Sequence, residues 1–250
     1  MANNNLSILG VIPARYKSSR LEGKPLVKIN GIPMIKRTYD RAKQCELLSD
    51  LLVATDDDQI YNYCVDNGMR CVMTSSDCKT GTDRVAEVSQ KTSYDLYINI
   101  QGDEPVIDPI AIEQITNEFL KYGEEYAAYN LYKIIDADYA KSNTIIKSIV
   151  NEKDELLYMS RARIPFSQKM EEISFKQQIP VYGYTKKALD AFSRCETKTI
   201  NEKYEDIEML RFIDLGLKVK MLETNVDSIA VDVPADIRKV EDFLNKNNLE

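Results

Sequence analysis

The sequence contains no histidine among its 250 residues. This absence excludes zinc sites built on imidazole, Ser-His and Cys-His nucleophile pairs, and the usual imidazole general base. Any catalysis must therefore depend on carboxylates, cations, hydroxyl groups or a metal ion.

Cysteine is scarce, with five residues and no Cys-x-x-Cys pair. The odd number favours reduced, structural thiols over a secreted disulfide framework. Long apolar runs are also missing, since no segment approaches the roughly 18 to 20 residues that a membrane-spanning helix needs. The start, Met1-Ala2-Asn3-Asn4-Asn5, lacks the basic flank of a signal peptide. We expect a soluble, cytoplasmic protein with no membrane partner.

An excess of positive charge is absent as well, because 40 acidic residues face 33 basic ones. A net charge of -7 argues against a broad nucleic-acid footprint, which needs clustered cations to displace counterions from phosphates. Neither Walker A nor Gly-x-Gly-x-x-Gly occurs, so P-loop hydrolysis and NAD chemistry lose support. The 44% hydrophobic content suffices for the core of a single domain, residues 1–250.

In the first half of the chain, apolar periodicity predicts strands that alternate with helices. The expected strands cover residues 6–12, 51–54, 70–73 and 95–100, and the expected helices cover 33–45, 59–67 and 82–91. Such alternation implies right-handed crossovers and a mostly parallel sheet.

The second half is less regular. It predicts strands at 127–134, 145–150 and 156–165, helices at 186–194 and 203–215, strands at 218–222 and 229–231, and a last helix from 234. A hairpin turn at 151–154 predicts antiparallel pairing. We therefore expect a small antiparallel lobe beside the main sheet, around residues 125–185.

A cationic loop follows the first expected strand. Between residues 13 and 28 the single acid Glu22 stands against five cations, Arg15, Lys17, Arg20, Lys24 and Lys28. Ligands of parallel sheets bind outside the carboxyl ends of the strands, so this loop is a candidate polyphosphate clamp, with hydroxyl donors at Ser18 and Ser19. The alternative is a solvated loop whose charges bind nothing.

Two aspartates follow expected strands. Asp103 comes after 95–100, behind Gly102, whose missing side chain lets the backbone approach a ligand, and Asp232 comes after 229–231. Two such carboxylates could hold one Mg²⁺, whose octahedron water and substrate phosphates complete. Aspartate also precedes helices as an N-cap, and this second interpretation stays open for both residues.

Several short motifs occur in a fixed order along the chain. They are Ile12-Pro13-Ala14-Arg15-Tyr16, Ser19-Arg20-Leu21-Glu22-Gly23-Lys24-Pro25-Leu26, Ala54-Thr55-Asp56, Gly81-Thr82-Asp83-Arg84, Gln101-Gly102-Asp103-Glu104-Pro105, Tyr158-Met159-Ser160-Arg161-Ala162 and Val231-Asp232-Val233-Pro234. In this combination the chain resembles the 3-deoxy-manno-octulosonate (KDO) cytidylyltransferase family.

The resemblance implies an α/β, Rossmann-like nucleotide-diphospho-sugar transferase fold, a mostly parallel sheet with a small antiparallel dimerisation lobe. It also implies a homodimer and an enzyme that uses Mg²⁺ to transfer CMP from CTP to the anomeric hydroxyl of an acid sugar. Pyrophosphate is then the second product, and the expected pathway is lipopolysaccharide or capsule synthesis.

The same resemblance assigns residues to roles. The nucleotide positions are Pro13, Ala14, Arg15, Ser18, Arg20, Lys24, Thr74, Ser75, Gly102 and Asp103. The sugar positions are Arg84, Gln101, Arg161, Gln178, Tyr182, Glu205 and Glu208. The metal positions are Asp103 and Asp232, and the catalytic ones are these two with Arg15 and Lys24. Arg84 would pair with the sugar carboxylate, which a planar guanidinium matches well.

Within the expected helix 203–215 and its approach, the spacing of Glu202, Glu205 and Glu208 predicts three carboxylates along one side of a helix. This arrangement suits a polyhydroxyl ligand, and a charged solvent face is the alternative.

Three departures from the family pattern bear on the choice of sugar. Gln178 and Cys78 stand where the family often has histidine, and Glu22 stands where proline is common. A close KDO analogue, 8-amino-KDO, or a nonulosonic acid therefore remains an alternative substrate. From a different class comes a catalytically silent nucleotide-binding paralogue.

Overall fold

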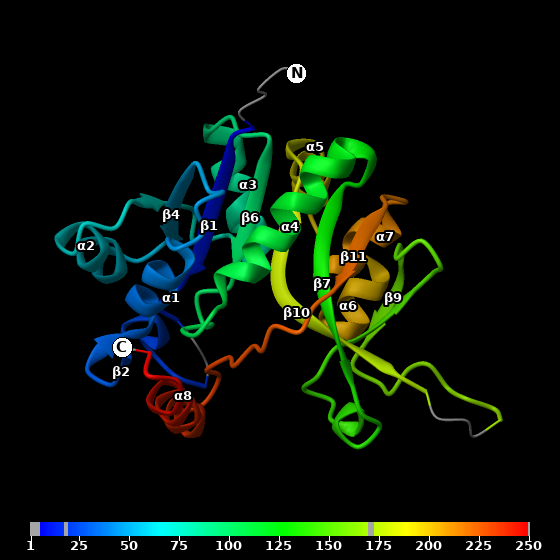
Figure 1. The fold of residues 1–250 in the computed structure, drawn as a ribbon. Coiled ribbons are helices and arrows are strands. Elements are labelled where there is room, and N and C mark those ends of the chain that lie inside the picture. Colours follow the sequence, from blue (N-terminus) through cyan, green and yellow to red (C-terminus); the bar gives the residue numbers. More distant parts are fainter. Residues whose placement is uncertain (1–5, 18–19, 170–172, 250) are drawn as a thin grey trace.

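The computed structural model describes residues 6–17, 20–169 and 173–249. Within these residues nine strands form one sheet (Figure 1), in the order β11-β7-β10-β6-β1-β4-β5 with β8 and β9 attached beside β10. The strands are β1 (Ile8–Ala14), β4 (Asp50–Thr55), β5 (Cys71–Met73), β6 (Leu96–Ile100), β7 (Ala128–Ile135), β8 (Lys147–Val150), β9 (Leu156–Ser160), β10 (Phe175–Tyr184) and β11 (Val219–Glu223). A separate short hairpin joins β2 (Lys28–Ile29) to β3 (Ile32–Pro33).

Strand β1 lies at the centre of the parallel part of the sheet. It pairs in parallel with β4 on one side and with β6 on the other. Ile8 and Ile12 belong to the apolar cluster on one face, whereas Leu9 and Val11 belong to the cluster on the opposite face. Helices therefore cover both faces, which explains why the strand reads as a continuous apolar run.

The helices are divided between the two faces. Apolar side chains of α1 (Met34–Ala42), α2 (Asp58–Asp66) and α4 (Pro109–Tyr122) join the cluster of Ile8 and Ile12. Those of α3 (Gly81–Lys91), α5 (Lys186–Ser193) and α7 (Met209–Asp214) join the cluster of Leu9 and Val11. Short α6 (Ile200–Glu205) packs beside α7, and α8 (Pro234–Asn247) closes the chain against β2.

The antiparallel lobe is continuous with the main sheet. The carboxyl half of β10 pairs with β6, and its amino half pairs with β8. Strand β7 runs antiparallel to β10 along both halves. The predicted fold class, a mostly parallel α/β sheet with an antiparallel extension, is confirmed, and the extension shares its strands with the sheet rather than lying beside it.

Three predicted elements differ from the structure, and α4 and β10 lie where the sequence predicted none. No element was predicted for 109–122, where Asp108 caps α4 by accepting the backbone N–H of Ile110. The predicted helix 203–215 is wrong, because Asp206 adopts φ 54° and separates α6 from α7. The strand predicted at 156–165 ends at Ser160, and residues 229–231 form no strand.

No helix in the described part of the chain is long and apolar enough to cross a membrane.

Candidate active site

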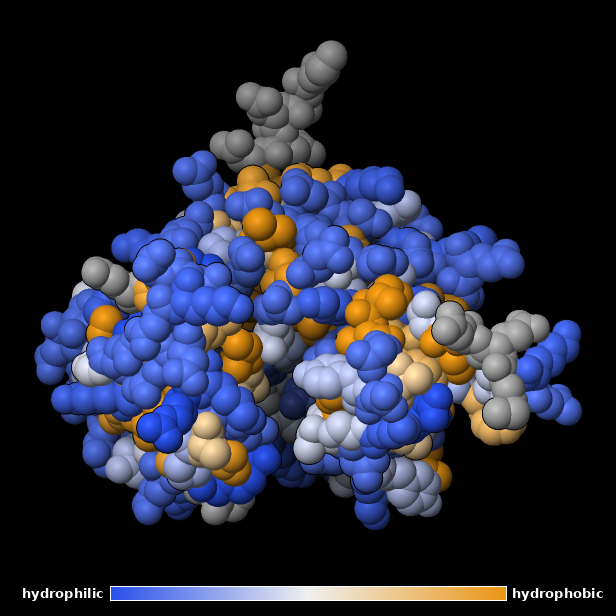
Figure 2. All heavy atoms as spheres, turned by 60° about the horizontal axis from the view of Figure 1, so that its bottom comes forward, coloured by the Kyte–Doolittle hydropathy of each residue, from blue (hydrophilic) through white to orange (hydrophobic). Residues whose placement is uncertain are grey.

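A cavity of about 320 Å³ opens beyond the carboxyl ends of β1 and β6. Figure 2, which brings this edge forward, shows a hollow between two masses with mainly hydrophilic surfaces. The cavity lining contains most of the residues that the sequence assigns to the site: Pro13, Ala14, Arg15, Arg20, Lys24, Arg84, Gln101, Gly102, Asp103, Glu208 and Asp232. Residues from distant parts of the chain therefore meet at the predicted edge of the sheet.

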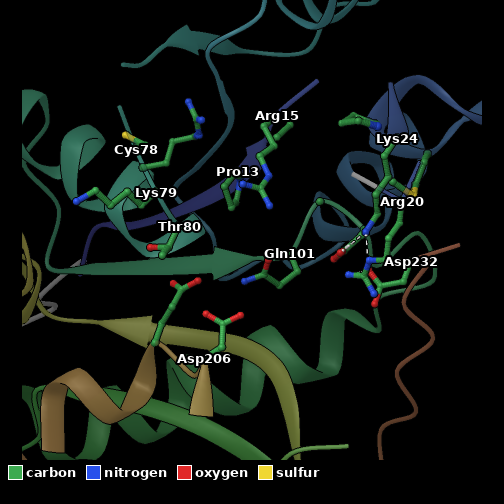
Figure 3. A pocket seen from close by; sticks show the side chains of 18 of the residues that line it. Pro13, Arg15, Arg20, Lys24, Cys78, Lys79, Thr80, Gln101, Asp206 and Asp232 are labelled. Atoms are coloured by element: carbon green, nitrogen blue, oxygen red, sulfur yellow. Dashed lines mark hydrogen bonds and ion pairs between the residues drawn. The ribbon is translucent and has the colours of Figure 1, made fainter. Parts of the chain in front are cut away.

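The cationic loop after β1 folds back on itself. Gly23 adopts φ 63° and donates its N–H to the carbonyl of Tyr16, at 3.1 Å. Glycine tolerates this left-handed conformation because it has no Cβ atom. The turn leads into a short 3₁₀ helix that begins at Lys24 and directs this side chain into the cavity (Figure 3). Arg15, Arg20 and Lys24 line the cavity, as the clamp requires, whereas exposed Lys17 and Lys28 do not.

Gly102 brings the loop after β6 against the end of β1. A Cβ atom at this position would lie 2.7 Å from the carbonyl oxygen of Pro13, too close for any side chain. Glycine is therefore needed at Gly102 for contact with protein backbone, whatever ligand the residue also meets.

Lys24 connects the two aspartates that the sequence singles out. Its Nζ lies 2.6 Å from Asp103 Oδ2 and 3.1 Å from Asp232 Oδ1. Arg20 Nη2 lies 3.0 Å from the same Asp232 oxygen. Figure 3 shows this group at one side of the cavity. Two carboxylates separated by more than a hundred residues in sequence thus converge on one cationic position.

The N-cap interpretation of the two aspartates is wrong. Helix α4 is capped by Asp108, and α8 begins after Val233 with Asp236 accepting the backbone N–H groups at its start. The carboxylates of Asp103 and Asp232 instead contact the ammonium group of Lys24, which lies between them.

This pair fits a divalent cation. Both carboxylates contact a single ammonium group, so their oxygens already share one position of positive charge. Among the described residues no three Asp, Glu, Cys or His side chains form a cluster. Mg²⁺ usually takes one or two protein carboxylates and completes its shell with water and phosphate oxygens, so two acids suffice.

Glu104, beside Asp103, points away from the cavity. Its side chain is 1% exposed, and Oε1 accepts a hydrogen bond from Ser228 Oγ at 2.8 Å. Burial, assisted by the charge of Asp103, raises the pKa of Glu104 from 4.5 to about 8. The acid is therefore largely protonated at neutral pH.

The opposite wall is formed by the start of α3 and the start of α7. Thr80 caps α3, and its hydroxyl accepts the N–H of Asp83 at 3.1 Å. Glu208 Oε2 accepts the N–H of Thr82 at 2.9 Å. Burial raises the pKa of Glu208 above its ordinary value, while hydrogen bonds from Thr82 oppose this effect.

Arg84 lies at the boundary between the cavity and the core. It is 3% exposed, and Nη2 lies 3.3 Å from Asp56 Oδ2. Its Nη1 donates to the hydroxyl of Thr74. Thr74 and Ser75, which the resemblance assigns to the nucleotide, do not line the cavity themselves but contact Arg84, which does.

Four of the predicted sugar residues lie outside the cavity lining and form two pairs. Arg161 donates its Nε to the carbonyl of Glu205, whose carboxylate accepts the N–H of Arg161 at 2.9 Å. Gln178 Nε2 donates to Tyr182 Oη at 2.6 Å. Ser18, predicted for the nucleotide, lies outside the described residues.

The predicted row of three carboxylates on one helix is wrong. Glu202 is fully buried in a two-pronged ion pair with Arg211, with both N–O distances 2.6 Å. Glu205 ends α6, and Glu208 precedes α7 on the far side of the turn at Asp206. The three side chains consequently have three different sets of partners.

Sequence reasoning missed several residues of the cavity. They are Pro25, Met34, Cys78, Lys79, Thr80, Gly81, Lys198 and Asp206. One signal was available, since Thr80 and Asp83 have the spacing of a capping box directly before a helix. No predicted motif contains Lys198 and Asp206, which lie on either side of α6 and pair with each other.

The charge of the lining favours a polyanion. Six cations face four acids around the cavity, although the whole chain is acidic. The cations are Arg15, Arg20, Lys24, Lys79, Arg84 and Lys198. Forked guanidinium groups and ammonium groups at the carboxyl edge of a parallel sheet are suited to phosphate oxygens. The lining therefore suits a ligand that carries several phosphate groups.

The chain belongs to the cytidylyltransferase family, which matches it over residues 9–229. It is 38% identical over 246 residues to a 3-deoxy-manno-octulosonate cytidylyltransferase of Fusobacterium nucleatum, covering 98% of this chain and 100% of that one. It is 40% identical over 235 residues to an 8-amino-3,8-dideoxy-manno-octulosonate cytidylyltransferase of Shewanella frigidimarina, covering 92% and 96%.

A solved structure leads to the same family. The fold superimposes with a TM-score of 0.91 and 34% identity on a CMP:2-keto-3-deoxy-manno-octonic acid synthetase complexed with CTP. The match covers 96% of this chain and 99% of that one. The predicted enzyme class, a cytidylyltransferase, is confirmed.

Proposed function

We propose that the protein transfers CMP from CTP to the anomeric hydroxyl of KDO or a close KDO-like acid sugar, releasing pyrophosphate. The observation that carries the proposal is the position of Lys24 between Asp103 and Asp232, in a cavity that Arg15 and Arg20 also line. This arrangement supports a polyphosphate site next to a divalent-cation site. The relatives over almost the whole chain support the choice of CTP and sugar.

The transfer needs no covalent enzyme intermediate. The sugar oxygen forms a bond to the α-phosphorus while the bond to the departing pyrophosphate breaks, and the hydroxyl proton passes to solvent or to a carboxylate. Arg15, Arg20 and Lys24 would neutralise charge on the bridging and pyrophosphate oxygens. Because the chain has no histidine, its contribution is positioning and electrostatic stabilisation rather than imidazole catalysis.

Asp103 and Asp232 are the residues that would hold Mg²⁺. The bound ion supplies positive charge to the phosphate oxygens and lowers the cost of bringing an anionic sugar toward them. The chain would contribute two acidic oxygen ligands, and the cations around them would contact the phosphate groups.

The sugar would lie against the wall opposite the Lys24 group. Arg84, Gln101 and Glu208 line the cavity there, and Arg84 offers a planar partner for the sugar carboxylate. Two further pairs do not line the cavity themselves: Arg161 with Glu205, and Gln178 with Tyr182.

A second candidate substrate is 8-amino-KDO. The relative at 40% identity is named for that sugar, and Gln178 stands where the KDO family often has histidine. An amino group at C8 would add a positive charge, which the acidic side chains Asp206 and Glu208 of the cavity could balance.

We further propose that the protein works as a homodimer in the cytoplasm. The antiparallel lobe exposes large apolar side chains, with Ile134 at 39%, Tyr139 at 54% and Phe166 at 89% exposure. Such residues on one lobe favour burial against a second copy. CTP is a cytoplasmic metabolite, which supports the location.

The direct test measures pyrophosphate release from each nucleoside triphosphate against KDO, 8-amino-KDO and a sialic-type acid, with and without Mg²⁺. We expect release with CTP, an octulosonate sugar and Mg²⁺ together. Release with none of these sugars, despite CTP binding, would favour a silent nucleotide-binding protein instead.

A further inference from the structure

We propose that Glu104 is a positioning residue for Asp232: it fastens the segment of residues 224–233, which we call the C-terminal linker, so that Asp232 faces Asp103. The inference rests on the proposed function, because it concerns the assembly of the site that would hold the divalent cation.

The C-terminal linker has no regular structure of its own. Figure 1 shows it running from β11 across the molecule to α8, and no helix or strand is assigned between Glu223 and Pro234. Asp232 lies near its end, so its place depends on how the linker is attached. A ligand on such a segment pays the entropy of ordering the chain unless other contacts fix it beforehand.

Two contacts attach the linker to the loop after β6. Ser228 Oγ donates to Glu104 Oε1 at 2.8 Å, and the N–H of Val231 donates to the carbonyl of Asp103 at 3.0 Å. Asp103 and Glu104 are neighbours in sequence. The same loop therefore supplies one cation ligand and the anchor for the segment that carries the other.

Glu104 is buried although it carries a carboxyl group, and glutamate is rarely buried without a paired charge. It is 1% exposed, and its Oε2 has no hydrogen-bond partner among the described residues. A buried polar atom without a partner costs free energy, so packing alone would favour an apolar side chain here. The contact with Ser228 gives the carboxyl group a purpose that an apolar residue could not serve.

The alternative to positioning is a charge effect, in which a carboxylate beside Asp103 attracts the cation through space. The two explanations make different predictions for Glu104→Gln. The amide keeps the shape and an acceptor oxygen for Ser228 but cannot carry a negative charge. Glu104→Ala removes both, and Ser228→Ala removes the contact while leaving the carboxyl group in place.

The test measures the binding of Mn²⁺ to the full-length protein in the presence of CTP. Electron paramagnetic resonance gives the concentration of free Mn²⁺ at each step of the titration. Loss of an outer contact that orients a ligand typically weakens metal binding by about tenfold or more. We expect a loss of about tenfold for Glu104→Ala and for Ser228→Ala, and a change within about twofold for Glu104→Gln. Glu155→Ala, at a carboxylate in the antiparallel lobe that pairs with Lys218, is the matched control and should bind as the parent does.

Hydrogen exchange of residues 226–232 gives a second readout that does not require the metal. Faster exchange in Ser228→Ala and Glu104→Ala, but not in Glu104→Gln, is the expected result. The double variant should bind Mn²⁺ no more weakly than Glu104→Ala alone, because both changes break one contact.

Three results would overturn the inference: Mn²⁺ binding by Glu104→Gln as weak as that by Glu104→Ala, unchanged binding by Ser228→Ala, or unchanged exchange of the linker in all variants. Neither readout needs turnover. If no sugar is a substrate while the Mn²⁺ and exchange results follow this pattern, the proposed function fails and the positioning role of Glu104 stands.

Discussion

Lys24 Nζ lies 2.6 Å from Asp103 Oδ2, and the two residues follow neighbouring parallel strands, Lys24 after β1 and Asp103 after β6. Asp232 completes the group from a third segment, at 3.1 Å from the same nitrogen. The ammonium group of Lys24 thus connects the loop after β1 to both aspartates. The Lys24 side chain is 13% exposed, whereas the side chains of Asp103 and Asp232 are 30% and 43% exposed, so solvent still reaches both carboxylates.

Replacement of Lys24 tests the phosphate role of the loop. We expect Lys24→Ala to raise the KM for CTP at least about tenfold, because the variant loses the cation that we propose contacts phosphate in the bound state. The change should affect the sugar KM less. Steady-state kinetics with either substrate varied give the comparison. Lys17→Ala is the control, since Lys17 belongs to the same loop but does not line the cavity. An unchanged CTP dependence in Lys24→Ala would reject the clamp.

Asp103→Asn should lower turnover by at least about a hundredfold, because it removes a charged group that we propose as a ligand of the divalent cation. The fold should be retained, since the amide has the same volume. Asp108→Asn, five positions along, changes the N-cap of α4 and should leave turnover near the parental level. Turnover numbers at saturating substrates, with circular dichroism to check folding, decide the matter. Near-normal turnover in Asp103→Asn would remove this residue from the cation site.

Gly102→Ala places a Cβ atom 2.7 Å from the carbonyl oxygen of Pro13. We expect a loss of about 1–3 kcal/mol in the free energy of unfolding, because backbone must move to relieve the overlap, and a loss of activity as Asp103 moves with it. Gly81→Ala is the matched control. Its Cβ atom would lie 3.4 Å from the Pro13 ring, an ordinary contact. Chemical denaturation of both variants should separate them, and equal stability would contradict the argument.

Local sequence signals predicted the half of the site that local structure builds. The apolar run of β1 and the turn at Gly23 each depend on residues close in sequence, and the aspartate after a buried strand was recognisable at Asp103. The need for glycine at Gly102 is different, because it comes from the distant carbonyl of Pro13. The opposite wall depends on tertiary packing. Glu208 reaches the cavity only because Asp206 breaks the predicted helix, and its partner Thr82 lies 126 positions away in sequence. No periodicity records such a contact.

Alternatives that the sequence left open were settled by similar long-range contacts. Asp103 and Asp232 have the sequence context of N-caps. Only the position of Lys24 shows that both carboxylates instead face its ammonium group. The missed helix α4 is different, because Asp108 and Pro109 form a recognisable start signal. The sequence therefore contains a local signal for the start of α4.

The raised pKa of Glu104 predicts a pH dependence of stability. The pKa is about 8 in the folded protein and near 4.5 in the unfolded chain, so between these values the folded state holds a proton that the unfolded state has lost. The free energy of unfolding should therefore fall as pH rises through this window, by up to about 1.4 kcal/mol per pH unit. Glu104→Gln lacks this proton, so its stability relative to the parent should increase from pH 5 to pH 8. Urea denaturation in a chelating buffer measures the difference, and parallel pH profiles would contradict the assignment.

Glu205 offers a test of the sugar side of the cavity. Its Oε1 accepts a hydrogen bond from Ser160 Oγ at 2.6 Å, and its Oε2 accepts the N–H of Arg161. The carboxylate therefore holds the end of β9 against α6, behind the lining that Glu208 forms. We expect Glu205→Ala to raise the sugar KM about tenfold or more while changing the CTP KM less than about threefold, because Arg161 loses its anchor on the sugar side only.

The same carboxyl contacts make stability a necessary control for this variant. Glu196→Ala, at an exposed glutamate whose carbonyl accepts Lys79 Nζ, removes a side chain nearby without breaking a contact of β9 and should change neither KM. Glu202→Gln should behave oppositely to Glu205→Ala: it breaks the buried pair with Arg211 and should cost about 3–5 kcal/mol of stability with little selective effect on either substrate. A selective loss of CTP binding in Glu205→Ala would place the residue on the nucleotide side and reverse the orientation proposed for the two substrates.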